Sequence, residues 1–199
     1  HSFSSFGRRL CVAGALRHQH NDCRLVWGQV KTREVVGTVV KPAIAHLHEA
    51  CSDSVDECSW MELVADGPQV PTYFVSHSWE EPCRELFAAI GHVVAAKGLG
   101  ADDVFWVCTF ANNQFRLEWR DMSLLKSPFR EAAKRSECAL LVMDPSGRCL
   151  QRSWCLFELL VVMSEGIPLT LCTARGLVGS EAVATEPLAD WARRVDPLS

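Results

Sequence analysis

Four short apolar runs in the second half of the chain alternate with segments of helical periodicity. The runs are residues 73–76, 103–110, 138–144 and 167–172. Each is apolar along most of its length, as is typical of strands buried on both faces of a sheet. Strands that alternate with helices form a parallel sheet with right-handed crossovers. The sequence therefore predicts an α/β fold with helices on both faces of a parallel sheet.

Three helices are predicted between these strands, at residues 82–98, 127–136 and 153–166. Pro82 stands in the first turn of the first helix, a position that tolerates proline. Ser127 and Ser153 are the predicted N-caps of the other two. Gly166 and the nearby proline are expected to end the last helix.

Residues 1–72 give a weaker pattern. Residues 34–40 favour a strand, residues 42–51 a short helix, and residues 58–65 suit either. We interpret the chain as three parts. Residues 71–175 form the α/β domain, and residues 1–70 are an N-terminal extension packed on it. Residues 176–199 are a C-terminal segment with a short helix around residues 188–194.

Composition restricts the kind of protein this is. Of 199 residues, 48% are hydrophobic and 22% charged, as in globular proteins that fill a core. The net charge is −4 and no block of Lys or Arg stands out, which argues against a nucleic-acid partner. No apolar stretch approaches the roughly 20 residues of a membrane helix. We therefore expect a soluble protein without membrane insertion.

The ten cysteines are expected to be free thiols. Cys108, Cys155 and Cys172 fall within predicted core elements, where unpaired cysteine is common. The spacing shows no regular disulfide framework, which favours a reducing compartment, and we expect the cytoplasm. Residues 1–20 carry three arginines and no acid, so they suit the tail of an organelle presequence or an ordinary basic arm.

Histidine and cysteine share one spacing at residues 18–23 and 46–51, with Cys58 beyond. Such side chains can ligate zinc. Neither cluster has a paired Cys-x-x-Cys, and two histidines separated by one residue do not share a helix face. We predict no metal site, with zinc at these clusters as the alternative.

One carboxylate, Glu158, interrupts the apolar run of residues 154–163. An ionised group in apolar surroundings costs several kcal/mol unless it is paired or hydrated. Glu158 is therefore either a structural glutamate paired with an arginine or a carboxylate that faces a cleft near the positive end of a helix. Three polar clusters follow the strands, at residues 76–81, 111–116 and 144–148, on the edge where parallel sheets bind ligands. This arrangement favours the second interpretation.

Two motifs carry a resemblance to a known family. Residues 73–79 read Tyr-Phe-Val-Ser-His-Ser-Trp, and residues 152–159 read Arg-Ser-Trp-Cys-Leu-Phe-Glu-Leu. Together they resemble the first strand and the third helix of the TIR (Toll/interleukin-1 receptor) domain. With the Asn-Asn-Gln loop at residues 112–114, they are most similar to a divergent TIR-like group from eukaryotic microbes. The resemblance covers residues 70–175 and implies a flavodoxin-like fold with about five parallel strands.

The resemblance implies two alternative functions. Some TIR domains are hydrolases that cleave NAD at the nicotinamide–ribose bond, using the glutamate of the helix motif, which here is Glu158. NAD is then the substrate, and no cofactor is implied. Other TIR domains are signalling modules that bind protein partners or self-associate without turnover. The loop at residues 111–119 lacks the glycine that many TIR domains use in assembly.

The predicted nucleotide pocket has several candidate contacts, each with a structural alternative. The resemblance places the following residues in the pocket: Ser76, His77, Ser78, Trp79 and Trp154. His77 suits a proton donor, a phosphate contact or a structural histidine. Trp79 suits stacking on a base or packing at the rim. Asn113 suits a hydroxyl contact or a turn, and Arg116 is expected near a diphosphate, with Arg152 as a further basic candidate.

Overall fold

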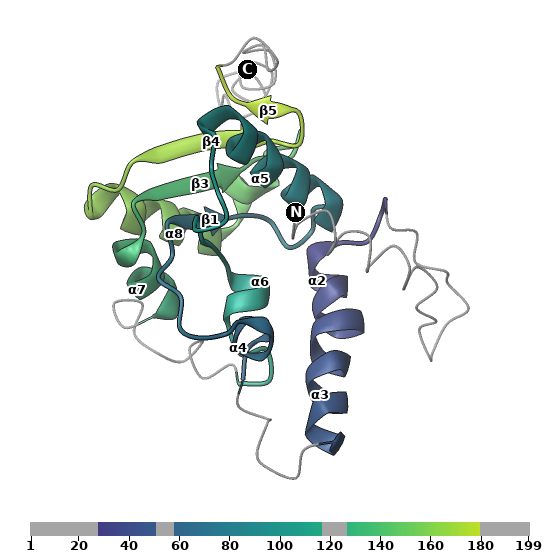
Figure 1. Cartoon of the computed structure of the whole chain (residues 1–199). Helices are drawn as coiled ribbons and strands as arrows, with labels where there is room; N and C mark the ends of the chain where they lie inside the picture. The colour runs from purple at the N-terminus through teal and green to yellow at the C-terminus, as the bar shows by residue number, and fades with distance from the viewer. Residues whose placement is uncertain (1–27, 51–57, 117–126, 180–199) are drawn as a thin grey trace.

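The computed structural model describes residues 28–50, 58–116 and 127–179, without the side chains of residues 47–50 (Figure 1). Its five-stranded sheet has the order β2-β1-β3-β4-β5. The strands are β1 (Tyr73–Ser76), β2 (Phe105–Val107), β3 (Cys138–Val142), β4 (Leu169–Thr173) and β5 (Gly176–Leu177). The first four are parallel, and β5 pairs antiparallel with β4. The α/β class and the parallel sheet are confirmed, and the order is that of flavodoxin-like folds apart from the direction of β5.

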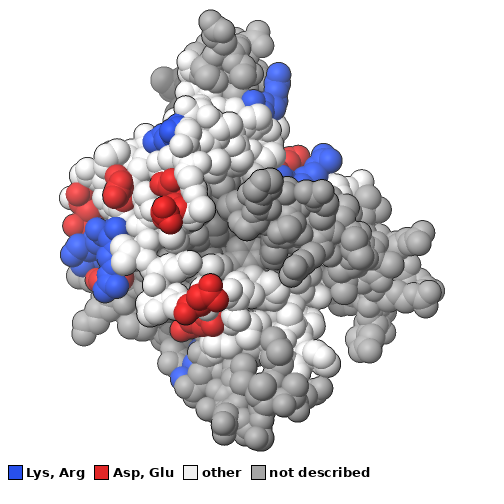
Figure 2. Space-filling view, in the orientation of Figure 1, with Lys and Arg blue, Asp and Glu red and all other residues white. Residues whose placement is uncertain are grey.

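Helices cover both faces of this sheet, with α5 on one side and α7 and α8 on the other (Figure 1). The helices are α2 (Thr32–Val35), η1 (Val36–Val40), α3 (Lys41–Ala50), α4 (Trp60–Val64), α5 (Cys83–Lys97), α6 (Cys108–Ala111), α7 (Pro128–Arg135), η5 (Arg148–Gln151) and α8 (Ser153–Ser164). Within the described ranges, none is long and apolar enough to cross a bilayer. Acidic and basic side chains lie in small, interspersed groups on the face shown in Figure 2.

The alternation of side chains along the strands divides the core into two layers. Val75 and Leu140 point to the layer that holds α5 and the N-terminal helices. Phe74 and Ala139, their neighbours in sequence, point to the layer of α7 and α8. Because every residue of β1 and β3 is buried, both strands need apolar residues on both sides.

The prediction of a strand at residues 34–40 is wrong. These residues form α2 and the π-helical turn η1, which continue into α3. Val36, Val40 and Ile44 recur every four residues and are buried, so helical spacing fits their burial better than the β preference of valine. The π-helical turn precedes Pro42, which has no N–H to donate to the carbonyl four residues earlier.

The two remaining N-terminal predictions have clear outcomes. The predicted helix at residues 42–51 corresponds to α3, which begins at Lys41. Residues 58–65, left open between helix and strand, contain α4. Ser59 caps this helix by accepting from the backbone N–H of Glu62, whose carboxylate in turn accepts from the N–H of Ser59.

The second predicted strand is too long. β2 ends at Val107, and the next residues form the short helix α6. Phe110 turns towards α5, where its ring lies 5.9 Å from that of Phe87. The side-chain amide of Gln114 donates to the carbonyls of Cys108, Thr109 and Asn112, which closes the turn after α6.

The predicted helix caps are only partly correct. Ser127 caps α7 by accepting from the N–H of Arg130 at 3.3 Å, as predicted. Ser153 is instead the first residue of α8, and Arg152 holds the cap position after the 3-10 turn η5, which the sequence did not indicate. Pro82 likewise caps α5 from outside the helix. The predicted helix around residues 188–194 lies outside the described residues.

Candidate functional site

The strand order places a topological switch point between β1 and β3. These strands are neighbours, but the chain leaves β1 for β2 on one side and leaves β3 for β4 on the other. Ligands of open α/β sheets bind beyond the carboxyl ends of the strands at such a point. Four segments lie at this edge of the sheet: the loop at residues 77–82, helix α6, the turn at residues 143–147 and the start of α8.

Glu158 and Ser76 form the centre of the candidate site. Glu158 lies on the inner face of α8 with 4% of its surface exposed, and Ser76 ends β1 with 3% exposed. The Ser76 hydroxyl donates to Oε2 of Glu158 at 2.5 Å, across 82 positions of sequence. No ion pair joins Glu158 to another residue in the described part of the chain. Among the described residues, Glu158 is therefore not the arginine-paired structural glutamate that the sequence allowed as an alternative.

The surroundings of Glu158 favour its neutral form. Burial raises the pKa of Glu158 from 4.5 to about 8, because the charged form loses its hydration. The Ser76 hydroxyl, Trp154 and the guanidinium of Arg152 oppose this effect by stabilising the charge. The site therefore holds a largely protonated carboxyl at neutral pH, whose charge responds to any cation placed beside it.

His77 adds a second neutral group. Burial, assisted by the positive charge of Arg152, lowers the pKa of His77 from 6.5 to about 4. Its Nε2 lies 3.5 Å from the hydroxyl of Thr109 at the start of α6, and its backbone carbonyl accepts from the thiol of Cys155. At neutral pH the imidazole is uncharged and lies between β1, α6 and α8.

The next two predicted residues shape the loop after β1. Ser78 is fully buried, and its hydroxyl accepts from the N–H of Glu80 at 3.3 Å. Trp79 is half-buried, and its indole nitrogen contacts the sulfur of Cys108 at 3.3 Å. Its ring packs against the core layer under α7 and α8. These contacts match the structural alternative of an aromatic residue that packs at the rim.

Trp154 belongs to the same site, whereas Asn113 closes a turn. The ring of Trp154 packs edge-to-face on Phe129 at 4.8 Å. The side-chain oxygen of Asn113 accepts from the N–H groups of Phe115 and Arg116, at 2.8 and 3.2 Å. Arg116 is exposed on this turn. The structure thus brings Ser76 and Trp154 to the carboxyl of Glu158, with His77 directly after Ser76 at the same strand end. It leaves Asn113 and Arg116 on the neighbouring loop.

A second buried carboxyl was missed by the sequence analysis. Glu81 is 2% exposed, and its Oε1 has no hydrogen-bond partner among the described residues. Burial raises its pKa to about 9, with the negative charges of Asp144 and Glu85 adding to the effect. The only sequence signal was its place beside Glu80, directly before a proline and a helix.

The N-terminal helices hold the loop that carries these residues. Glu80 pairs with Lys31 and Arg33, both at 2.9 Å. Backbone N–H groups of Thr32 and Arg33 donate to the carbonyls of Glu81 and Trp79, at 3.0 and 3.1 Å. The geometry of the site edge therefore depends on a segment more than forty residues earlier in the chain.

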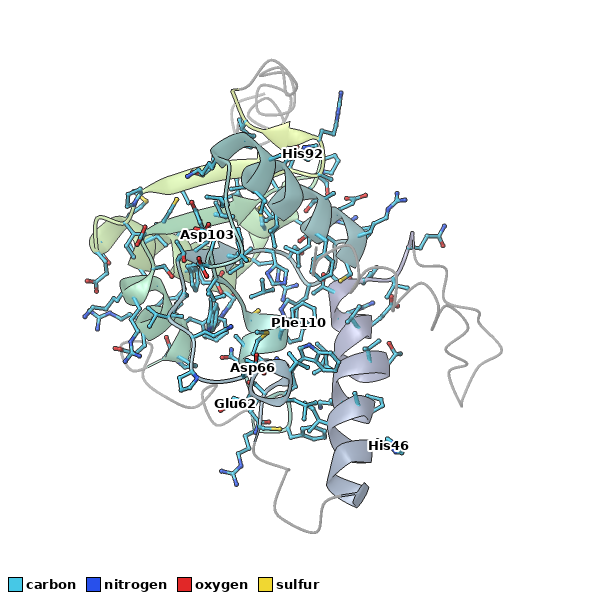
Figure 3. All side chains as sticks on the ribbon, in the orientation of Figure 1. His46, Glu62, Asp66, His92, Asp103 and Phe110 are labelled. Atoms are coloured by element: carbon cyan, nitrogen blue, oxygen red, sulfur yellow. The ribbon has the colours of Figure 1, made fainter. Side chains whose placement is uncertain are left out.

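The histidine and cysteine clusters show no metal site within the described ranges, where no group of three or more potential ligands comes together. His46 is exposed on α3 and points away from the domain (Figure 3). The cluster at residues 18–23 and Cys51 lie outside the described residues. Six described cysteines are free thiols: Cys83, Cys108, Cys138, Cys149, Cys155 and Cys172. Cys108 opens α6 instead of lying in a strand.

The site has four chemical groups. The titratable carboxyl of Glu158 accepts a hydrogen bond from a hydroxyl, and beside it lie the neutral imidazole of His77, the indole of Trp154 and the guanidinium of Arg152. Such a set can bind a hydroxylated or cationic ligand and stabilise positive charge. Comparison of the chain with models of protein families, with curated proteins and with solved structures finds no match.

Proposed function

We propose that this chain is a TIR-like domain that cleaves NAD at the nicotinamide–ribose bond, with Glu158 as the catalytic carboxyl. The observation that carries this proposal is the hydrogen bond between Ser76 and Glu158 at the switch point of the sheet. Nucleotides bind at this position in sheets with this strand order. A buried carboxyl with a raised pKa at a ligand-binding edge is typical of active sites.

The reaction requires little more than such a carboxylate. The bond between the ribose C1′ and the pyridinium nitrogen breaks, and its electron pair neutralises the nicotinamide ring. Positive charge then develops on the ribose, and an adjacent carboxylate stabilises it through charge and through the ribose hydroxyls. Water adds to C1′ and releases a proton to solvent, which yields ADP-ribose and nicotinamide.

The substrate itself supplies the condition for ionising Glu158. The pyridinium ring of NAD is positively charged, and a nearby positive charge lowers the pKa of a carboxyl. The Ser76 hydroxyl already favours the ionised form. Binding of NAD would therefore convert the neutral carboxyl into the carboxylate that the transition state needs.

The other predicted residues would bind the substrate. Trp154 and Trp79 would pack against the nicotinamide or the adenine, since indoles stack on aromatic rings. His77 and Ser78 would contact ribose hydroxyls from the loop after β1. Asn113 and Arg116 would reach the second ribose and the diphosphate from the exposed turn after α6, and Arg116 would supply the positive charge. Ser78 and Asn113 would act in part through the loops that they already stabilise.

The test is the release of nicotinamide from NAD by the purified chain, measured by chromatography with and without a crowding agent. Glu158→Gln should abolish release while circular dichroism shows an intact fold. The matched control is Glu131→Gln, which removes an exposed carboxylate on α7 and should leave the rate unchanged. A well-folded wild-type protein that releases no nicotinamide at high concentration would refute the enzymatic function.

A second function is favoured by the low exposure of Glu158 and His77, at 4% each. A domain of this kind that binds protein partners without turnover needs no access to these groups, and their burial would then only stabilise the fold. This alternative predicts that NAD neither reacts nor changes the melting temperature of the wild-type protein. Nicotinamide release that depends on Glu158 would exclude it.

A further inference from the structure

Residues 30–33 form a segment, here called the strap, that pairs with the loop at residues 77–82. An isolated antiparallel bridge joins Lys31 to Pro82, so the two segments run side by side in opposite directions. Backbone hydrogen bonds of 2.7 to 3.1 Å also join the strap to the loop and to the start of α5; in donor-to-acceptor order they are Thr32 to Glu81, Arg33 to Trp79 and Cys83 to Val30. The strap therefore holds the loop through main-chain groups along its length.

Glu80 adds two charged contacts between the strap and the loop. Its carboxylate accepts from Nζ of Lys31 and from the guanidinium of Arg33, each at 2.9 Å. The side chain of Glu80 is 31% exposed, and those of the two cations are 35% and 52% exposed. Because these pairs meet water, salt screens them and their contribution is modest. They can therefore be broken without disturbing the core.

The opposite side of the loop contacts the surroundings of Glu158. Cys108 of α6 and Cys155 of α8 lie near this carboxyl, since burial and, next, the negative charge of Glu158 raise the pKa of both thiols to about 12. The carbonyl of His77 accepts from the thiol of Cys155 at 3.5 Å, and the indole nitrogen of Trp79 lies 3.3 Å from the sulfur of Cys108. The loop thus covers both thiols that flank the carboxyl.

The polar contacts of the loop are stronger on the side of the strap. On the side of the site, two of them involve sulfur, which is a weak donor and a weak acceptor. A third, between Nε2 of His77 and the hydroxyl of Thr109, is long at 3.5 Å. On the side of the strap, N–H groups donate to carbonyls and two cations contact one carboxylate. The position of the loop therefore depends on the strap.

We propose that the strap holds the loop closed over Glu158 and that the site opens when the strap is released. Glu158 is 4% exposed, so a dissolved ligand can contact its carboxyl only after the covering segment moves. The strap then controls access to the site from a segment that contributes no side chain to it. The consequence that NAD enters through this opening rests on the proposed function, whereas the opening itself does not.

The test is the rate at which iodoacetamide alkylates individual cysteines of the full chain, measured by mass spectrometry of its peptides. Buried thiols of raised pKa react only when the structure opens. Glu80→Gln breaks both ion pairs and should raise the rates at Cys108 and Cys155 at least about threefold. Cys138, buried at the opposite edge of the sheet, should react at an unchanged rate. The matched control is Glu131→Gln, which removes an exposed carboxylate on α7.

A second variant removes a main-chain bond. Thr32 is the first residue of α2, a position that tolerates proline. Lys31 before it has φ −75° and ψ 153°, the extended backbone that a residue preceding proline prefers. Thr32→Pro therefore removes the N–H that donates to Glu81 without interrupting the helix, and it should raise the rates at Cys108 and Cys155 about tenfold.

Two results would overturn the proposal. One is an unchanged rate at Cys108 and Cys155 in both variants when circular dichroism shows them folded; Glu80→Gln decides alone if the proline variant does not fold. The other is an equal rise at Cys138, because the opening would then be unfolding of the whole domain. Faster alkylation of the two site thiols without nicotinamide release would support the strap and refute only the enzymatic function.

Discussion

Replacement of Glu158 by glutamine should change how the stability of this protein depends on pH. In the folded chain burial holds the proton on Glu158 up to about pH 8, whereas the unfolded chain releases it near the ordinary value of 4.5. Unfolding between these values therefore releases a proton, so the free energy of unfolding of the wild type falls as pH rises through this window. Glutamine has a similar shape and does not titrate, so the variant loses this dependence.

The size of the effect follows from the two pKa values. A full pH unit inside the window is worth about 1.4 kcal/mol for one proton. Because Glu158 begins to ionise in the folded state near pH 8, the wild type should lose about 2 kcal/mol between pH 6 and pH 8 through this group. Glu81 contributes equally to both proteins and cancels in the comparison.

The measurement is urea unfolding followed by circular dichroism at pH 6, 7 and 8 in reducing buffer. The free energy of unfolding of Glu158→Gln minus that of the wild type should increase steadily over this range. Glu131→Gln, which removes an exposed carboxylate, is the control for a change in net charge. A difference that stays constant from pH 6 to pH 8 would refute the claim that burial keeps Glu158 protonated.

Three further substitutions test separate parts of the structure. Ser76→Ala removes the hydroxyl that favours ionised Glu158, so in the same urea assay the free energy of unfolding of the variant should keep falling to a higher pH than that of the wild type. If the free energy of unfolding stops falling at the same pH in both proteins, the role of that hydrogen bond is contradicted. Leu140→Ala, at a fully buried position in β3, should lower the free energy of unfolding by about 2–5 kcal/mol, and a loss near zero would place it outside the core. Gly98→Ala should cost about 1 kcal/mol in thermal unfolding, because φ is 64° there while the space is open; a neutral result would mean that the helix end rearranges.

The elements that the sequence predicted well have strong local signals. β1 matches its predicted range because three apolar residues lead directly into a polar cluster that begins at Ser76. α7 begins as predicted because serine followed by proline suits an N-cap and a first helical position. α5 ends at Gly98 as predicted, since its left-handed backbone favours glycine.

The errors occurred where packing outweighs local preference. Valine-rich residues 34–40 favour a strand locally, but their burial in the core layer that includes α5 follows helical spacing. Residues 108–110 are apolar enough to continue the strand. The chain instead turns into α6, which brings the ring of Phe110 beside that of Phe87. Neither outcome follows from the segment itself, because the packing partner lies elsewhere in the chain.

For the site, the residue types were foreseen but their environment was not. Glu158 and Ser76 were both selected, yet the bond between them and the absence of an arginine partner among the described residues depend on how α8 packs against β1. Glu81 was missed because an acid in a polar run gives no sign of burial. The support of the loop comes from Lys31 and Arg33, which lie in a stretch for which the sequence predicted no element.

The sequence by itself determined the alternation of strands and helices and placed one acid within an apolar helix, because periodicity and capping act within a few residues. Tertiary structure decided that this acid is buried, neutral and bonded to a serine 82 positions away. The charge of a carboxyl depends on how much water surrounding segments remove, and those segments meet only in the folded chain.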